Sequence, residues 1–442
     1  VAELEATTPR KGNRKVKLTV SGQVNEAVIF WDDGSETNAY VVSNNSSRTR
    51  FRFVGDAKID NDWSAGYLLE IGVRYAPSNN RSQLSSAAGG DANNIDIRHS
   101  AWWLDNKRLG RIWVGQTSSA SDGITEINLA NVIASPGDFR DTWVGGYRLR
   151  RSGTTGQGGT SGLTWGGIFN ATDSLVGEGD RDNVVRYVSP TFQGFTFSAA
   201  WGEDDMWDVA LRYANEFNGV RVAGGIGYRQ INDFNNNDGM GGCANLSNPA
   251  SGTQASGNTV IAAAGNNANN LSNSSTDCSQ LGLSGSVMHV ATGLYVYGAY
   301  GKETDDNRDA RFGTNVKDEH NQWYLQAGIE QNWFGIGKST LYGEYHNVNG
   351  GSVPASLTVA GQVNPVDVIN SWNVAAYIHG THVRTWGFGF VQAIDAAALD
   401  LFINYRVREA DVTLGRSADG TLRRSNAIED LSIITAGGMI KF

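Results

Sequence analysis

Several features that commonly organise a protein of 442 residues are scarce in this sequence. Proline occurs only 7 times, which excludes a collagen or a proline-rich linker protein. The net charge of −9 argues against general nucleic-acid binding, because phosphates need a basic patch. A membrane-spanning helix needs about 20 consecutive apolar residues, yet the longest moderately apolar, uncharged run, residues 281–301, contains five glycines. A helical membrane protein is therefore not expected.

Cysteine is also scarce, with only two residues in the chain. Cys243 and Cys278 both lie in one polar stretch, and no Cys-x-x-Cys pair or nearby histidine cluster competes for them as metal ligands. We therefore expect a single loop-closing disulfide, which implies an oxidising compartment. Two free thiols within a loop are the alternative.

Residues that would carry catalysis or bind a cofactor are scattered or incomplete. The six histidines are dispersed, and His379 and His382 lack the third ligand that a zinc site would need. No Gly-x-Ser-x-Gly nucleophile motif is present. The acidic residues of 305–309 could bind Ca²⁺, although most such clusters are simply solvated. We expect no enzyme and no cofactor, with an outer-membrane hydrolase and a structural Ca²⁺ as the alternatives.

What the sequence does have is glycine, 55 residues, together with aromatic residues and a hydrophobic pattern of period two. The clearest segment is 63–75, in which one parity carries seven apolar residues with an aromatic residue at each end. The other parity is mostly small, polar or charged and includes Glu70 and Arg74. An apolar band between two aromatic girdles is typical of a strand that faces lipid on one side and a water-filled lumen on the other.

Similar alternation recurs along the chain and predicts sixteen strands. Their expected ranges are 15–32, 48–59, 62–76, 94–105, 109–117, 183–188, 193–203, 206–217, 218–231, 282–290, 293–302, 320–334, 338–348, 383–394, 397–412 and 427–442.

The connections between these strands alternate between short and long, with one exception, a tight link at 204–205. Such asymmetry is typical of outer-membrane barrels, which have periplasmic turns at one rim and extracellular loops at the other. We therefore predict an all-β fold, a transmembrane antiparallel β-barrel over residues 15–442. In lipid the sheet must close, because every backbone polar group needs a partner. Residues 1–14 are expected to form an N-terminal periplasmic extension, and 232–281 a long extracellular loop.

Four segments and the last residue resemble trimeric general porins of alphaproteobacteria. Residues 115–117 end an expected strand and are followed by 121–127, as at the start of the constriction loop of these porins. Residues 201–213 are similar to their central hairpin and 293–301 to another strand, while Phe442 matches the terminal aromatic residue that the outer-membrane assembly machinery reads. The resemblance implies a sixteen-stranded barrel, a homotrimer and a third loop folded into each lumen.

Passive diffusion needs a narrow, wet and charged constriction rather than a catalytic group. The loop and its return, residues 118–182, would supply the acidic side of that constriction. Its candidate residues are Asp122, Glu126, Asp138 and Asp141. Strand arginines would supply the basic side: Arg50, Arg52, Arg74, Arg98 and Arg111, with Arg48 as a further candidate nearer the loop. Alternatively, each arginine only neutralises a nearby carboxylate or contacts lipopolysaccharide at a rim.

The sequence therefore predicts an outer-membrane porin through which small hydrophilic solutes and ions diffuse passively. Its expected partners are two further copies of itself, outer-membrane lipid and lipopolysaccharide, and the solutes. A substrate-specific channel is the main alternative, favoured if aromatic residues line the lumen; the orientations of Trp102 and Trp113 are ambiguous from parity. A structural or adhesive barrel plugged by its loops is the third possibility.

Overall fold

The computed structural model describes residues 16–85, 94–132, 146–153, 155, 160–169, 176–202, 205–232, 277–305, 317–350, 353–354, 376–416, 422–424 and 428–442. The expected periplasmic extension, residues 1–14, and most of the expected long loop at 232–281 lie outside these ranges. Both remain predictions. The last residues of that loop are a correction, because β13 already begins at Cys278.

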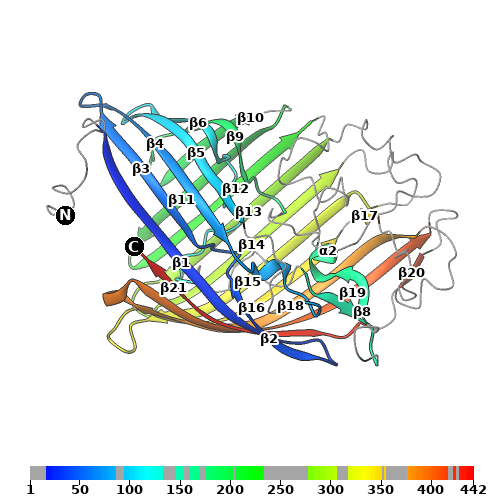
Figure 1. Ribbon diagram of the computed structural model, residues 1–442. Coiled ribbons are helices and arrows are strands. Elements are labelled where there is room, and N and C mark those ends of the chain that lie inside the picture. The colour runs from blue at the N-terminus through cyan, green and yellow to red at the C-terminus, as the bar shows by residue number, and fades with distance from the viewer. Residues whose placement is uncertain are drawn as a thin grey trace.

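Sixteen long antiparallel strands close into a single tilted barrel (Figure 1). In ring order they are β1 (Lys17–Asp32), β3 (Arg50–Lys58), β4 (Trp63–Arg74), β5 (Asn94–Asn106), β6 (Gly110–Ser118), β9 (Arg181–Val188), β10 (Phe195–Gly202), β11 (Trp207–Phe217), β12 (Val220–Ile231), β13 (Cys278–His289), β14 (Leu294–Asp305), β15 (Glu319–Gln331), β16 (Ser339–Gly350), β18 (Ala376–Ile394), β19 (Leu399–Arg416) and β21 (Leu431–Lys441).

The ring closes where the first strand meets the last. Strand β1 pairs with β21 over ten residue pairs, from Gln23–Lys441 to Asp32–Ser432. The seam extends by one residue, because the backbone N–H of Phe442 donates to the carbonyl of Gly22 at 3.1 Å and the reverse bond measures 2.9 Å. A closed ring leaves no unpaired sheet edge in the hydrocarbon. The predicted barrel of sixteen strands is confirmed.

Short strands extend the sheet on the side of the long connections. They are β2 (Thr37–Ser43), β17 (Val353–Pro354) and β20 (Leu422–Arg424), while β7 (Arg148–Arg150) and β8 (Thr160–Thr164) form a separate pair that leads into the short helix α2 (Trp165–Phe169). The polar residues 33–47 were expected to be a loop, but β2 pairs with the second half of β1 there. Strand β18 likewise begins seven residues before the expected position 383. These extensions carry little hydrophobic alternation, which is why the sequence pattern missed them.

The two rims differ as predicted. Short connections such as 59–62, 107–109 and 218–219 lie at one rim, on the left of Figure 1, and we call it the turn rim. The long connections lie at the opposite, loop rim, where the brief link between β10 and β11 is the exception noted in the sequence. At the tightest turn Asn218 and Gly219 both have positive φ, 48° and 77°. Asparagine and glycine tolerate this conformation, and it matches the twist of a hairpin.

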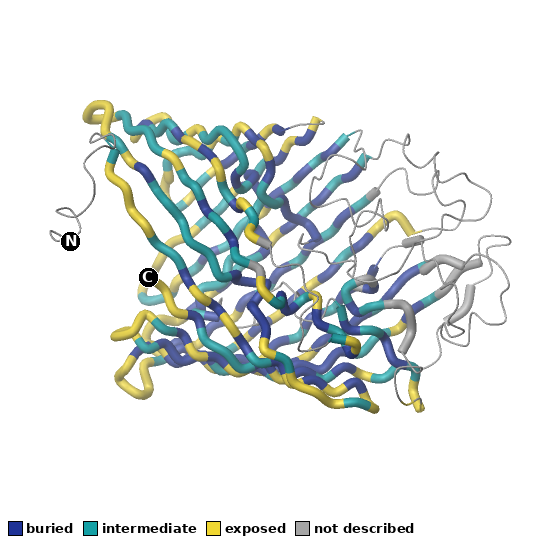
Figure 2. Tube along the Cα trace, in the orientation of Figure 1, coloured by how far each residue is buried: buried dark blue, intermediate teal, exposed yellow. Residues whose placement is uncertain are grey.

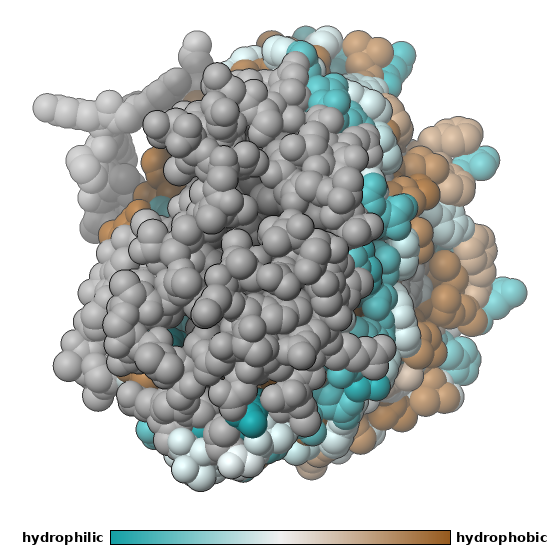
Figure 3. All heavy atoms as spheres, turned by 90° about the vertical axis from the view of Figure 1, so that its right-hand side faces the viewer, coloured by the Kyte–Doolittle hydropathy of each residue, from teal (hydrophilic) through white to brown (hydrophobic). Residues whose placement is uncertain are grey.

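The two faces of the wall have opposite chemistry. Tyr67 and Leu211 are exposed on the outer face, whereas Glu70 and Asp208 on the same strands are completely buried on the inner face. The strand tubes alternate between buried and less buried stretches accordingly (Figure 2). Seen from the loop rim, hydrophobic side chains gather on the outside of the wall (Figure 3). Among the described residues no helix has the length and apolar character to cross a membrane.

Candidate pore constriction

The connection after β6 turns into the barrel. We call its described first part, residues 119–132, the inner segment. It begins on Asp208 of β11, whose carboxylate accepts bonds from the backbone N–H groups of Ala120 at 3.0 Å and Ser121 at 2.7 Å. The Ser121 hydroxyl donates to the same carboxylate at 2.7 Å. Hydrogen bonds to a charged group are stronger than neutral ones, so Asp208 fixes the direction in which the loop enters the lumen.

The middle of the inner segment packs on the inner faces of β12, β13 and β14. Ser284 Oγ donates to the carbonyl of Ile124 at 2.6 Å, and the Tyr297 hydroxyl donates to the carbonyl of Thr125. Ile124 is completely buried. A Cβ atom on Gly225 of β12 would lie 2.6 Å from Ile124 Cδ1, so this glycine is what lets the loop approach the wall.

The inner segment ends on β15 and β19. Asn128 Nδ2 donates to Gln326 Oε1 at 2.8 Å, and the Asn131 backbone N–H donates to Glu330 Oε2 at 2.7 Å. Asn131 Nδ2 also donates to Asp400 Oδ1 at 3.0 Å. The inner segment therefore lines the lumen from β11 to β19. The predicted inward-folded third loop is confirmed.

Three carboxylates gather at the inner segment. Asp122 and Glu126 belong to it, and Glu178 reaches it from the returning end of the same loop, where it accepts bonds from the Thr125 N–H at 2.8 Å and the Thr125 hydroxyl at 2.6 Å. Burial raises the pKa of Glu178 well above its usual value, and the negative charges of Glu126 and Asp122 raise it further. The sequence analysis missed Glu178. Asp138 and Asp141 lie outside the described residues.

Three of the predicted arginines meet at Glu70. Arg98 Nε donates to Glu70 Oε1 at 2.7 Å, and Arg52 Nε donates to Glu70 Oε2 at 2.8 Å. Arg50 Nη1 lies 3.6 Å from Glu70 Oε1. The carboxylate is fully buried, whereas the Arg52 side chain is 42% exposed and that of Arg50 is 18% exposed. We call Glu70 and these three arginines the arginine wall. Its more exposed members, Arg50 and Arg52, are cationic and in contact with the lumen.

The remaining predicted arginines do not join Glu70 in the same way. Arg48 pairs with Asp96 at 2.8 Å, near the loop rim. Arg74 ends β4, and its side chain is not among those the structure describes. Arg111 pairs with Asp105 at 2.9 Å beside the 107–109 turn, far along β6 from the inner segment. Its role in the constriction stays a prediction, because parity gives the face of a strand but not the depth at which a side chain lies.

The strand order sets the arginine wall across the lumen from the middle of the inner segment. In the ring of sixteen, β14 lies halfway round from β4, and Tyr297 of β14 binds the inner segment. The two groups also share a level along the barrel. His99, the register partner of Glu70, contacts the Thr117 hydroxyl at 3.1 Å, two residues before the inner segment begins. The arginine wall and the part of the inner segment that Tyr297 binds therefore lie on opposite sides of the barrel.

A bulge in β5 resolves the ambiguous orientation of the tryptophans. The register of β4 with β5 shifts between Glu70 and Ile71, so that Arg98 and Trp103 both face inward although their parities differ. Trp102 is 52% exposed on the outer face, and Trp103 is buried on the inner face against Trp113. The inward pair is thus Trp103 and Trp113.

Cys278 is disulfide-bonded at the start of β13. Cys243 lies outside the described residues, so the predicted pairing remains a prediction. Among the residues that the structure describes, no group of three histidine, cysteine or acidic side chains could hold a metal ion.

Comparisons with known proteins agree on the fold. A family model described as Gram-negative porin matches residues 2–353. An anion-selective porin from Comamonas acidovorans has a TM-score of 0.55 and 14% identity, covering 97% of this chain and 100% of that one. In-vitro folded OmpT, an outer membrane protein of Vibrio cholerae, has a TM-score of 0.51 and 10% identity, covering 98% and 99%. Its trimer form has a TM-score of 0.50 and 11% identity, covering 97% and 99%. No curated protein matches the sequence.

Proposed function

Because this chain belongs to the Gram-negative porin family, we propose that it lets small hydrophilic solutes and ions diffuse passively across the outer membrane through a charged constriction. Its activity is transport down a gradient, and no group has to perform catalysis. We further propose that it works as a homotrimer in contact with lipid and lipopolysaccharide, and that it belongs to the alphaproteobacterial branch that its sequence resembles.

The observation that carries the proposal is the position of the inner segment opposite the arginine wall. Asp122 and Glu126 lie on the first, and Arg50 and Arg52 reach the lumen from the second. Opposite charges on two sides of a water-filled passage create a transverse field, which the low-dielectric wall strengthens. Polar solutes align in such a field, whereas apolar solutes lose hydration and gain little.

The decisive experiment is single-channel recording of the purified protein in a planar bilayer with KCl. We expect large steps in groups of three and a modest reversal potential in a salt gradient. The double variant Asp122→Asn, Glu126→Gln should shift the reversal potential toward anion preference, because it removes negative charge from one side of the passage. Absence of steps would refute an open pore, and an unchanged reversal potential would refute the role of these two carboxylates.

A substrate-specific channel remains the second candidate, and one observation favours it. Trp103 and Trp113 lie on the lumen face with Arg111 between them, 4.2 and 5.5 Å from the two ring centres. Aromatic and cationic side chains together can bind a solute rather than merely admit it. Competition of candidate solutes with the ion current distinguishes the two functions.

A further inference from the structure

A second charged cluster lies on the lumen face nearer the turn rim. It alternates aromatic rings and guanidinium groups across three strands: Trp103 of β5, Arg111 and Trp113 of β6, and Arg186 of β9. Arg186 stands 5.6 Å from the centre of the Trp113 ring, on which Arg111 also stacks. The quadrupole of an indole ring attracts a guanidinium group that lies over its face. These attractions stabilise the arrangement of the four side chains.

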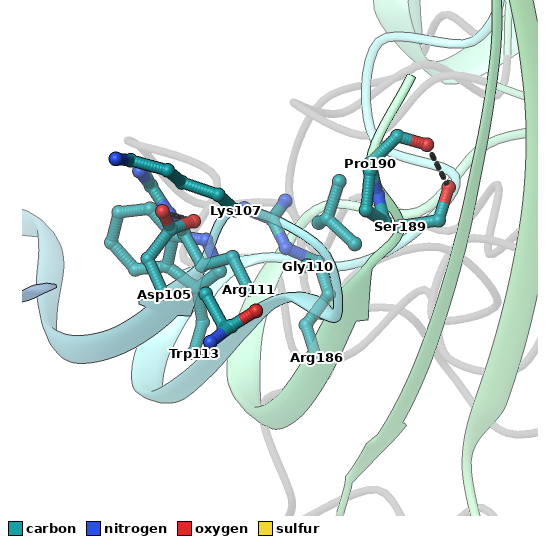
Figure 4. A pocket seen from close by; sticks show the side chains of 10 residues that line it. Asp105, Lys107, Gly110, Arg111, Trp113, Arg186, Ser189 and Pro190 are labelled. Atoms are coloured by element: carbon teal, nitrogen blue, oxygen red, sulfur yellow. Dashed lines mark hydrogen bonds and ion pairs between the residues drawn. The ribbon is translucent and has the colours of Figure 1, made fainter. Parts of the chain in front are cut away.

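The cluster borders a cavity of about 390 Å³, which we call the turn-rim pocket (Figure 4). This volume is in the range of sites that bind small molecules. Its cationic lining comes from Lys107, Arg111 and Arg186, and its apolar lining from Trp113, Val188 and Pro190. Asp105 is the one carboxylate in the lining, so the pocket has an excess of positive charge.

Arg186 lies in this lining without a carboxylate bonded to it, although the charges of Asp122 and Asp208 act on it from farther away. Arg111 pairs with Asp105 at 2.9 Å, but no carboxylate of the described residues lies within ion-pair distance of Arg186. Its Nη1 donates to the carbonyl of Ser119 at 3.3 Å, and its buried Nε has no hydrogen-bond partner in the described structure. A guanidinium group that lines a pocket and has no carboxylate bonded to it favours an anion there, because hydrogen bonds between charged groups are the stronger ones.

We propose that the turn-rim pocket binds a small organic carboxylate with a flat apolar body. The carboxylate pairs with Arg186, which forms no ion pair with the described residues. The apolar body lies against Trp113, Val188 and Pro190, and this contact removes its apolar surface from water. This assignment rests on the proposed function, since the ligand reaches the pocket through the open lumen, and it names the class of solute that the pore retains longest.

Binding has a consequence for conduction, because Arg186 also contacts the start of the inner segment. A ligand held on Arg186 lies next to Ser119, where the lumen begins to narrow. The bound molecule therefore obstructs the passage and neutralises a positive charge beside it. Occupancy is visible as partial, reversible block of the ion current.

The test is block of the KCl current by three probes: benzoate, acetate and benzyl alcohol. Benzoate has both the charge and the flat body, while each of the other two has one of them. We expect saturable block by benzoate, at a half-blocking concentration at least about tenfold below those of the other two. Block should be stronger from the turn-rim side, which can be compared by adding the probe to either chamber.

Two variants and one control separate the pocket from the general field of the pore. Arg186→Gln should raise the half-blocking benzoate concentration about tenfold or more, as expected for loss of a hydrogen bond to a charged group. Trp113→Leu should abolish the preference for benzoate over acetate. The control is Arg221→Gln, which removes a turn-rim arginine that pairs with Glu216 at 2.8 Å outside the pocket and should leave block unchanged.

The outcomes are distinct. If the wild type conducts KCl but benzoate blocks no better than acetate and benzyl alcohol, the pocket assignment is overturned while the proposed function stands. If Arg221→Gln weakens block as much as Arg186→Gln, the anion is held by diffuse charge and the assignment is likewise overturned. Absence of any KCl current would instead refute the proposed function.

Discussion

Replacing Glu70 by glutamine removes a carboxylate that Arg50, Arg52 and Arg98 share. The amide keeps the shape and one acceptor oxygen, so the change is mainly one unit of charge. Because Glu70 is completely buried and Arg52 is 42% exposed, the uncompensated charge appears at the lumen side of the arginine wall. We expect the pore to become more selective for anions.

The size of the effect can be worked out from Coulomb's law. A permeating ion about 7 Å from the changed group feels about 0.6 kcal/mol in water, and salt near 0.1 M screens this to about 0.3 kcal/mol. The anion gains this amount and the cation loses it, so the chloride-to-potassium permeability ratio should rise roughly threefold. Breaking a buried ion pair can cost about 3–5 kcal/mol. Lumen water reaches Arg52, so a loss of stability of about 1–3 kcal/mol is expected here.

The assay is the reversal potential of single channels in a KCl gradient, with thermal unfolding of the detergent-solubilised barrel measured on the same samples. Glu216→Gln is the matched control, because it also removes a carboxylate from an arginine pair but at the turn rim, where both side chains are nearly half exposed. A shift toward potassium, or equal shifts in both variants, would refute the reasoning that the arginine wall sets selectivity.

Three further predictions concern the loops. Intact mass with and without reductant, after alkylation, should show Cys243 and Cys278 bridged; two alkylated thiols without reductant would contradict this. Asp208→Asn weakens three hydrogen bonds to the inner segment and should raise single-channel conductance and its noise; unchanged traces would show that the segment is held elsewhere. Burial alone would raise the pKa of Asp33, but hydrogen bonds led by that of Arg150, 2.8 Å away, hold the pKa below its usual value. The stabilisation from these hydrogen bonds is present above the pKa of Asp33 in the unfolded chain and is lost as the pH falls through its pKa in the folded protein. The unfolding temperature should therefore drop in acid, and it should drop by less in Arg150→Gln. An equal drop in both proteins would exclude a contribution of this pair.

The sequence could determine the barrel because each strand contacts two different solvents. Side chains of a strand point alternately to its two faces, so those of residues 63–75 face lipid and lumen in turn. The hydrophobic pattern is therefore visible within each short segment of sequence. The difference between the two rims could be predicted in the same way, because the lengths of the connections can be taken from the sequence without tertiary information. All sixteen strands were predicted for this reason, and so were the lumen face of Glu70 and the inward turn after residue 118.

The sequence could not provide the depth of a side chain along the barrel axis, nor the partners of that side chain on other strands. Arg50 and Arg111 both have lumen parity, yet only the structure shows that the first reaches Glu70 and that the second pairs with Asp105. Glu178 joins Asp122 only because the loop returns to its own start, more than fifty residues later.

The bulge in β5 shows most directly why tertiary structure was needed. One residue more on one strand than on its neighbour reverses the parity beyond it, and nothing in the local alternation marks the place. Trp103 therefore faces the lumen and Trp102 the lipid. The sequence by itself determined a porous barrel with a charged inner loop. The sheet register decided which arginines meet at Glu70 and which gather with tryptophans at the turn rim, because these contacts join residues on separate strands.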